Sequence, residues 1–263
     1  MPDSSDSSTP RPSIAAAPVP IARADASSRA QRIARAAGST AREAASAVKR
    51  HALPHYTLGE EIANSVTHGI GAALSIAALV IMIVKAVVAG QHPASLACAL
   101  VFGITLILEY LASTLYHAIA PQAAKRVFRV IDHCGIYVLI AGSYTPFCLI
   151  TLAPAGGIQL CIAVWVCAVA GILFEVVMRE RQPRWLTAAI YLAMGWLVVF
   201  RLPQLVELLH PTALILLVAS GLSFSVGTIF YVLKKVCYMH SVFHVWVLAG
   251  SVLEFLAVVL FVI

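Results

Sequence analysis

Two histidines near the C-terminal end of the chain have the spacing of a metal-chelating pair. His240 and His244 enclose the sequence Ser-Val-Phe, so on a helix their imidazoles lie on one face and one turn apart. Ser113 and His117 enclose Thr-Leu-Tyr, and the same geometry places a hydroxyl and an imidazole on one face. This spacing suits the chelation of a single metal ion.

Two further groups of polar residues accompany these pairs. Asp132 and His133 follow Arg126 and Arg129 after about one turn, and a separate group, Glu61, Asn64 and His68, again shares one helix face. Ionisable side chains are costly inside a membrane, so each is a candidate functional residue.

A zinc ion bound by three neutral imidazoles keeps a fourth tetrahedral position open, as catalytic zinc sites do. Asp132 could hold or deprotonate a water molecule there, because zinc lowers the pKa of such a water from ~15.7 toward ~7. Ser113 could donate a hydrogen bond to a developing oxyanion. The chemistry that fits is hydrolysis of an amide or ester whose acyl chain enters from lipid.

The elements that must position these residues are membrane helices. Of the 263 residues, 60% are hydrophobic and only 11% are charged, whereas an average soluble domain has roughly 25% charged residues. Runs near the ~20 residues that cross a bilayer predict an all-α, polytopic membrane protein with seven transmembrane helices. The predicted spans are 62–88, 94–119, 127–150, 157–178, 185–200, 212–233 and 240–262.

The distribution of basic residues predicts the orientation. Sixteen of the 18 lysines and arginines lie in the N-terminal tail or in the second, fourth and sixth loops, and only Lys85 and Arg201 remain for the opposite side. The positive-inside rule then places the N-terminus in the cytoplasm and the C-terminus outside. In this topology all the polar groups above fall in the cytoplasmic half of the membrane.

Residues 1–57 are rich in Ser, Pro and Ala with scattered arginines, which predicts a disordered basic tail before a membrane domain at 58–263. Within the tail, 28–50 could instead form an Ala-rich helix on anionic lipid. The net charge of +6 is explained by topology, so no nucleic-acid partner is expected.

The chain resembles the hemolysin III family, the bacterial branch of the progestin and adipoQ receptor superfamily, which is related to alkaline ceramidases. The resemblance covers about 56–263 and rests on the four polar groups above, in the same order on the same spans. It implies a bacterial inner-membrane protein with zinc held by His117, His240 and His244. It also implies Asp132 at the zinc water, with Ser113 beside it, and membrane lipid as the partner and the source of a substrate.

Several alternatives remain open. Asp132 could pair with Arg126 or Arg129, and Ser113 could bond only to its own helix backbone. Glu61, Asn64 and His68 could orient the ligands or brace the bundle. His133 is expected at the membrane interface, and Glu109 and Glu254 either line a polar cavity or form a buried pair that joins helices. At the level of function, the alternatives are a membrane-perturbing or pore-like protein and a receptor or sensor with structural zinc.

Overall fold

The structure, a computed structural model, describes residues 28–40, 53, 56–89, 92–178, 182–233 and 236–263. The chain divides into two units, Met1–Ala52 and Leu53–Ile263. In the first, residues 28–40 form a helix with exposed side chains. The rest of the predicted disordered tail lies outside the described residues, apart from 53, 56 and 57, so that expectation stays a prediction.

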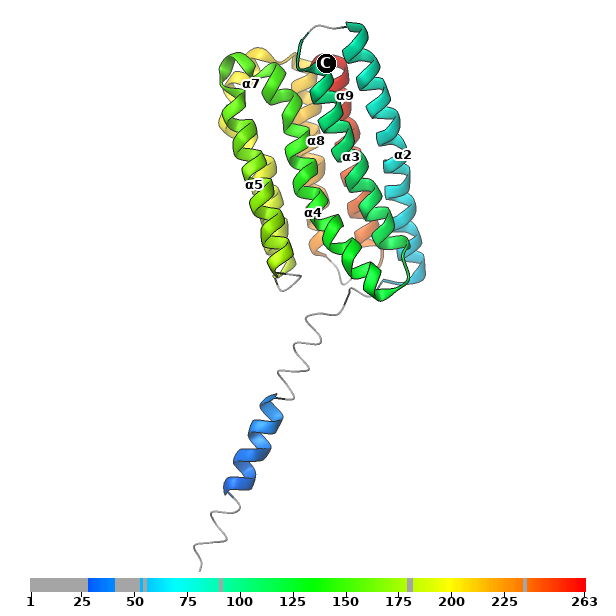
Figure 1. Ribbon diagram of the computed structural model, residues 1–263, viewed down its shortest axis with the longest axis vertical. Coiled ribbons are helices and arrows are strands. Elements are labelled where there is room, and N and C mark those ends of the chain that lie inside the picture. Colours follow the sequence, from blue (N-terminus) through cyan, green and yellow to red (C-terminus); the bar gives the residue numbers. More distant parts are fainter. Residues whose placement is uncertain (1–27, 41–52, 54–55, 90–91, 179–181, 234–235) are drawn as a thin grey trace, which may run out of the picture. The chain divides into compact units, whose positions relative to one another are not determined.

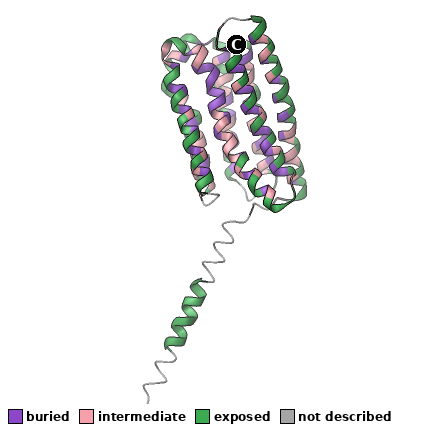
Figure 2. Ribbon diagram, in the orientation of Figure 1, coloured by how far each residue is buried: buried purple, intermediate pink, exposed green. Residues whose placement is uncertain are grey.

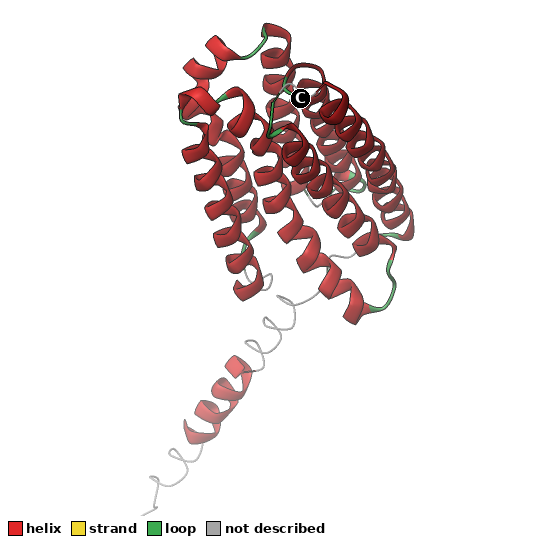
Figure 3. Cartoon of the chain, turned by 45° about the horizontal axis from the view of Figure 1, so that its top comes forward, coloured by secondary structure: helices red, strands yellow, loops and turns green. Residues whose placement is uncertain are grey.

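The second unit is a bundle of seven helical runs, each long and apolar enough to cross a membrane (Figure 1). All regular structure in the described residues is helical (Figure 3). The fold is therefore the predicted all-α seven-span bundle. Its elements are α2 (Leu58–Ala89), α3 (Ser95–Ala118), α4 (Gln122–Pro146) with the π-turn η1 (Phe147–Thr151), η2 (Ala153–Ala155), α5 (Gly157–Met178), α6 (Arg184–Gly195), η3 (Trp196–Arg201), α7 (Leu202–Leu208), α8 (Pro211–Val232) and α9 (Met239–Phe261).

The helices pack in a closed circle. Consecutive spans contact one another around the bundle, and the last helix, α9, packs against both α8 and the first helix, α2. Buried residues face inward and exposed residues face outward along the bundle (Figure 2). The exposed faces carry large apolar side chains such as Val80, Val84, Ile162, Val166 and Leu222, as expected where lipid takes the place of water.

The fifth span is longer than the predicted 185–200. It runs from Arg184 to Leu208 as α6, the 3₁₀ segment η3 and α7 in succession. Pro203 does not end the span: it lies in the first turn of α7, where a proline is tolerated because that backbone N–H has no partner within the helix.

The start of α2 is a capping box that also holds the start of α9. Thr57 Oγ1 accepts a 3.2 Å hydrogen bond from the Glu60 backbone N–H, and Glu60 Oε2 accepts one of 2.8 Å from the Thr57 N–H. The other carboxylate oxygen, Oε1, accepts a 2.9 Å bond from the N–H of Tyr238, just before α9. One side chain thus places the first turns of α2 and α9 next to each other.

Small residues allow the helices to approach closely along their length. A methyl group on Gly142 of α4 would come within 2.1 Å of the Thr105 hydroxyl on α3, and one on Gly171 of α5 within 2.3 Å of the Tyr137 ring on α4. Such contacts are typical of membrane helices, because close backbone packing supplies much of the stabilisation there.

Candidate metal centre

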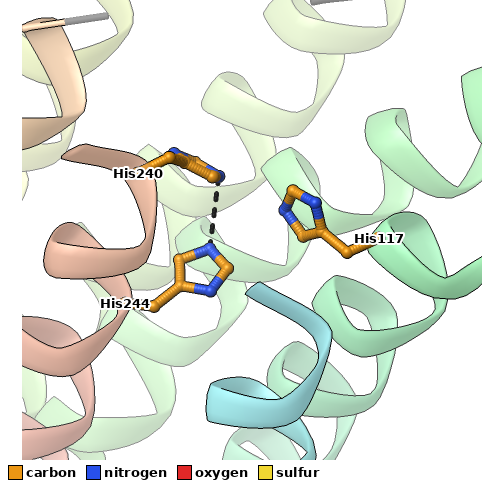
Figure 4. A group of neighbouring side chains, drawn as sticks. All are labelled: His117, His240 and His244. Atoms are coloured by element: carbon orange, nitrogen blue, oxygen red, sulfur yellow. Dashed lines mark hydrogen bonds between the residues drawn. The ribbon is translucent and has the colours of Figure 1, made fainter. Parts of the chain in front are cut away.

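Three histidines meet at the end of the bundle where α2 and α9 begin and α3 ends. His117 comes from the last turn of α3, and His240 and His244 come from the first turns of α9 (Figure 4). Their candidate ligand nitrogens all lie within 4.8 Å of one another. They form a group that can hold a metal ion, as the sequence predicted for these three residues.

The hydrogen bonds of these histidines fit a metal ion. The Nε2 atoms of His240 and His244 face each other at 3.2 Å. Two imidazole ligands in tetrahedral zinc coordination lie about 3.3 Å apart, from Zn–N bonds of roughly 2.0–2.1 Å. His117 Nε2 is buried and has no hydrogen-bond partner among the described residues. Because buried polar atoms are normally paired, this nitrogen is explained by a ligand between the helices.

Glu61 holds the other nitrogen of His117. Its Oε2 lies 2.7 Å from His117 Nδ1, and its Oε1 lies 2.7 Å from Lys125 Nζ at the start of α4. With its proton on Nδ1, the His117 ring donates to the carboxylate and turns the Nε2 lone pair toward the other two histidines. The two contacts that link Lys125, Glu61 and His117 form the carboxylate–histidine arrangement that commonly supports metal ligands.

Asn64 joins three helices behind the cluster. Its side-chain carbonyl accepts a 2.6 Å bond from the Ser241 hydroxyl on α9, and its amide nitrogen lies 3.4 Å from His117 Nδ1. Its backbone carbonyl lies 3.2 Å from His244 Nδ1, which leaves Nε2 of that ring for the cluster. Asn64 therefore contacts both helices that supply the histidines.

His68 lies beside the cluster and is not a member of it. Its ring stacks on that of His244 with centroids 3.5 Å apart and planes inclined by 14°. Its ring nitrogens are buried and have no hydrogen-bond partner within the described part of the chain. The two roles considered for His68 from the sequence, orienting the ligands or bracing the bundle, stay predictions.

Tyr56, which precedes α2, contacts two rings of the cluster. Its ring stacks on His240 at 5.2 Å and meets His117 edge-on at 5.6 Å. Burial raises the pKa of the Tyr56 hydroxyl, with a smaller opposing effect from Arg184, so the side chain stays neutral at physiological pH. Sequence reasoning missed Tyr56, because it precedes the first span and belongs to none of the spaced pairs.

A cavity of about 380 Å³ extends from the cluster into the bundle. Asp132 and Ser113 line it together with His240 and His244. The Asp132 carboxyl group lies close to Ser113, His117 and Arg129. Farther along, the cavity walls are mainly apolar side chains of α4, α6, α8 and α9, including Ile136, Leu139, Leu192, Leu217, Phe224 and Val247.

Three other acids and one histidine are placed by the structure. Glu109 and Glu254 both line the cavity, but its walls are mainly apolar, so the choice between the two roles considered for them stays open. The expected place of His133 at the membrane interface stays a prediction. His133 Nδ1 lies 2.9 Å from Oε1 of Glu175, a fully buried residue of α5. Sequence reasoning overlooked Glu175, although a carboxyl group within the apolar fourth span was a signal for it.

Most of the membrane unit is similar to known proteins. Residues 56–255 match the family model described as Haemolysin-III related. The chain is 42% identical over 204 residues to Hemolysin-3 of Bacillus cereus, covering 78% of this chain and 92% of that protein. It is 41% identical over 206 residues to the Hemolysin-3 homolog of Bacillus subtilis (strain 168), covering 78% of this chain and 96% of the homolog.

Proposed function

Since this chain belongs to the Haemolysin-III related family and is a multi-pass integral protein of the plasma membrane, we propose that it is a zinc-dependent hydrolase of lipid amides or esters. The observation that carries this proposal is the placement of three converging imidazoles at one end of an apolar cavity, next to a carboxyl group and a hydroxyl group. A metal site joined to an apolar chamber suits a substrate with a polar bond and a long hydrocarbon chain.

His117, His240 and His244 would hold the zinc. Imidazole nitrogens also suit copper, nickel and iron, but three histidines with an open position are typical of catalytic zinc. When bound, zinc supplies a Lewis acid that polarises a carbonyl group and makes water a better nucleophile near neutral pH.

The chain's own residues would carry the remaining roles. Asp132 accepts a hydrogen bond from the attacking water and takes up its proton as the carbon–oxygen bond forms. Ser113 donates a hydrogen bond to the carbonyl oxygen as negative charge develops on it. The apolar walls receive the acyl chain and exclude other water, which strengthens both interactions.

Metal analysis followed by a lipid hydrolysis assay tests the proposal. Purified wild type should contain about one zinc per chain and should cleave at least one lipid amide or ester. The triple variant His117→Ala, His240→Ala, His244→Ala should contain none and be inactive. Replacement of His92 and His210, which lie outside the cluster, is the matched control. It should preserve both the zinc content and the hydrolytic activity. Zinc-loaded wild type that is inert on a broad lipid panel would contradict the proposal and favour a receptor with structural zinc.

The name of the Bacillus cereus relative, Hemolysin-3, suggests membrane permeabilisation as a second candidate. It predicts dye leakage from proteoliposomes with wild type and with the zinc-free triple variant alike, because lysis does not require the metal site. Leakage no greater than that from an unrelated seven-helix protein would eliminate this candidate.

A further inference from the structure

A carboxylate–imidazole pair lies at the edge of the cavity, apart from the three-histidine cluster. Glu175 of α5 has its Oε1 at 2.9 Å from His133 Nδ1, while its Oε2 accepts a 2.6 Å bond from Gln182 Nε2. Glu175 is fully buried, and only 13% of the His133 side chain is exposed. No role in the function proposed above has been given to this pair.

The pair is built by close packing between α4 and α5. The contact of Gly171 with the Tyr137 ring brings the two helix backbones together one turn before Glu175. The Tyr191 hydroxyl of α6 donates a 2.8 Å bond to the His133 backbone carbonyl. Three helices therefore fix the position of one imidazole, a degree of support typical of catalytic groups.

His133 is also part of the cavity wall. The cavity-facing residues of α4 recur at helical spacing, and Arg129, Asp132, His133 and Ile136 are the first four. Because Nδ1 is bound to Glu175, Nε2 is the ring nitrogen left for the cavity. A carboxylate on Nδ1 fixes the tautomer of the ring and balances the charge that the ring gains when both nitrogens carry protons.

Further titratable groups surround the pair within the described residues. They are Glu109 on α3, Asp132, Cys134 and Tyr137 on α4, Tyr191 on α6, Tyr231 on α8 and His240 on α9.

We propose that His133, oriented by Glu175, is the catalytic residue that donates a proton to the leaving group during hydrolysis. The inference rests on the hydrolase function proposed above. Cleavage of an amide or alkyl ester needs both a group that removes a proton from water and a group that protonates the departing nitrogen or oxygen. Asp132 is assigned the first task, and His133, on the same cavity face of α4, is placed for the second.

The proton balance closes within these residues. As water attacks, its proton passes to Asp132 and a carbon–oxygen bond forms. The carbon–nitrogen or carbon–oxygen bond to the leaving group then breaks, with the proton on His133 Nε2 going to the departing atom. The proton on Asp132 returns to Nε2 through cavity water, so one water is consumed and both side chains recover their starting states.

Two substrates with the same acyl chain but different leaving groups test the proposal. The amine of an alkyl amide leaves only when its nitrogen is protonated. The p-nitrophenolate of a nitrophenyl ester is stable as an anion and needs no proton to leave. In His133→Gln, kcat for the amide should fall about 100-fold, while kcat for the nitrophenyl ester and the zinc content stay near wild type. Glu175→Gln, which keeps the hydrogen bond but removes the charge, should reduce amide turnover selectively as well. The control His92→Gln should change neither substrate's rate.

An equal loss on both substrates would show that His133 is structural, and wild-type rates on both would show that it is not needed. Either result overturns the inference while leaving the hydrolase function intact. If wild type cleaves neither substrate nor any other lipid, the hydrolase function fails first and the role of His133 falls with it.

Labelling with diethyl pyrocarbonate, followed by peptide mass spectrometry, tests the geometry without turnover. The reagent attacks only an unprotonated nitrogen, so Nε2 of His133, which carries the proton to be transferred, should react slowly in wild type and several-fold faster in Glu175→Gln. Equal rates in the two proteins would overturn the inference even if hydrolysis is found.

Discussion

Replacing Glu61 with glutamine should weaken zinc binding without removing any zinc ligand. Glu61 joins His117 Nδ1 and Lys125 Nζ through two 2.7 Å contacts, with 17% of its side chain exposed. Glutamine keeps the length but loses the negative charge that orients His117 and binds Lys125. Loss of such a supporting contact typically lowers metal affinity about 10–100-fold, or about 1.4–2.7 kcal/mol.

Competition for zinc against a chromophoric chelator, with purified protein in detergent, measures this affinity. Glu207→Gln is the matched control, because Glu207 is an exposed carboxylate on α7, which supplies no residue of the cluster. It should leave zinc affinity close to wild type.

Lys125 provides a further check on the reasoning. Lys125→Met should also weaken zinc binding, because the Glu61 carboxylate would lose one of its two anchors. In the double variant Glu61→Gln, Lys125→Met, the loss of zinc binding free energy should be smaller than the sum of the losses in the two single variants, since both changes act on the same contact. A zinc affinity of Glu61→Gln within about twofold of wild type, well below the range expected for a supporting contact, would refute the assignment.

Three other outcomes are expected. Asp132→Asn should retain zinc but lower lipid turnover by at least about 100-fold, because the proton acceptor is lost; metal analysis and kinetics on one preparation check this. Gly142→Ala should lower the free energy of unfolding by about 1–3 kcal/mol, because a methyl group would lie 2.1 Å from the Thr105 hydroxyl; a thermal denaturation curve at the wild-type midpoint would contradict it. Alkaline phosphatase fused after Ile263 should be active and a fused green fluorescent protein dark, since the positive-inside rule places that end outside.

Much of the architecture follows from the sequence because lipid imposes simple rules on it. A span needs about 20 apolar residues, and the predicted spans overlap all seven helical runs. The error in the fifth span has a physical cause. Arg201 and Pro203 are residue types typical of a loop, but an arginine can reach the membrane surface along its own aliphatic stem, and a proline in a first turn breaks no hydrogen bond.

The three-histidine cluster was predictable because spacing and topology agreed. Spacing put His240 and His244 on one face, and the alternation of span direction put His117 at the same depth. The supporting contacts were less predictable. Lys125 was counted only as a topogenic charge, and its contact with Glu61 depends on the relative rotation of α2 and α4. The contact between His133 and Glu175 depends likewise on how α4 and α5 pack, which helical periodicity within one segment does not specify.

The return of α9 to pack against α2 means that the metal centre depends on a helix that leaves the ribosome after the other six described spans. His117 is inserted into the bilayer long before His240 and His244 are synthesised, so a nascent chain cannot capture the ion with all three rings. Metal uptake would then mark completion of the seven-helix bundle. Any premature stop before α9 would yield a membrane-inserted polypeptide lacking two of the three imidazoles.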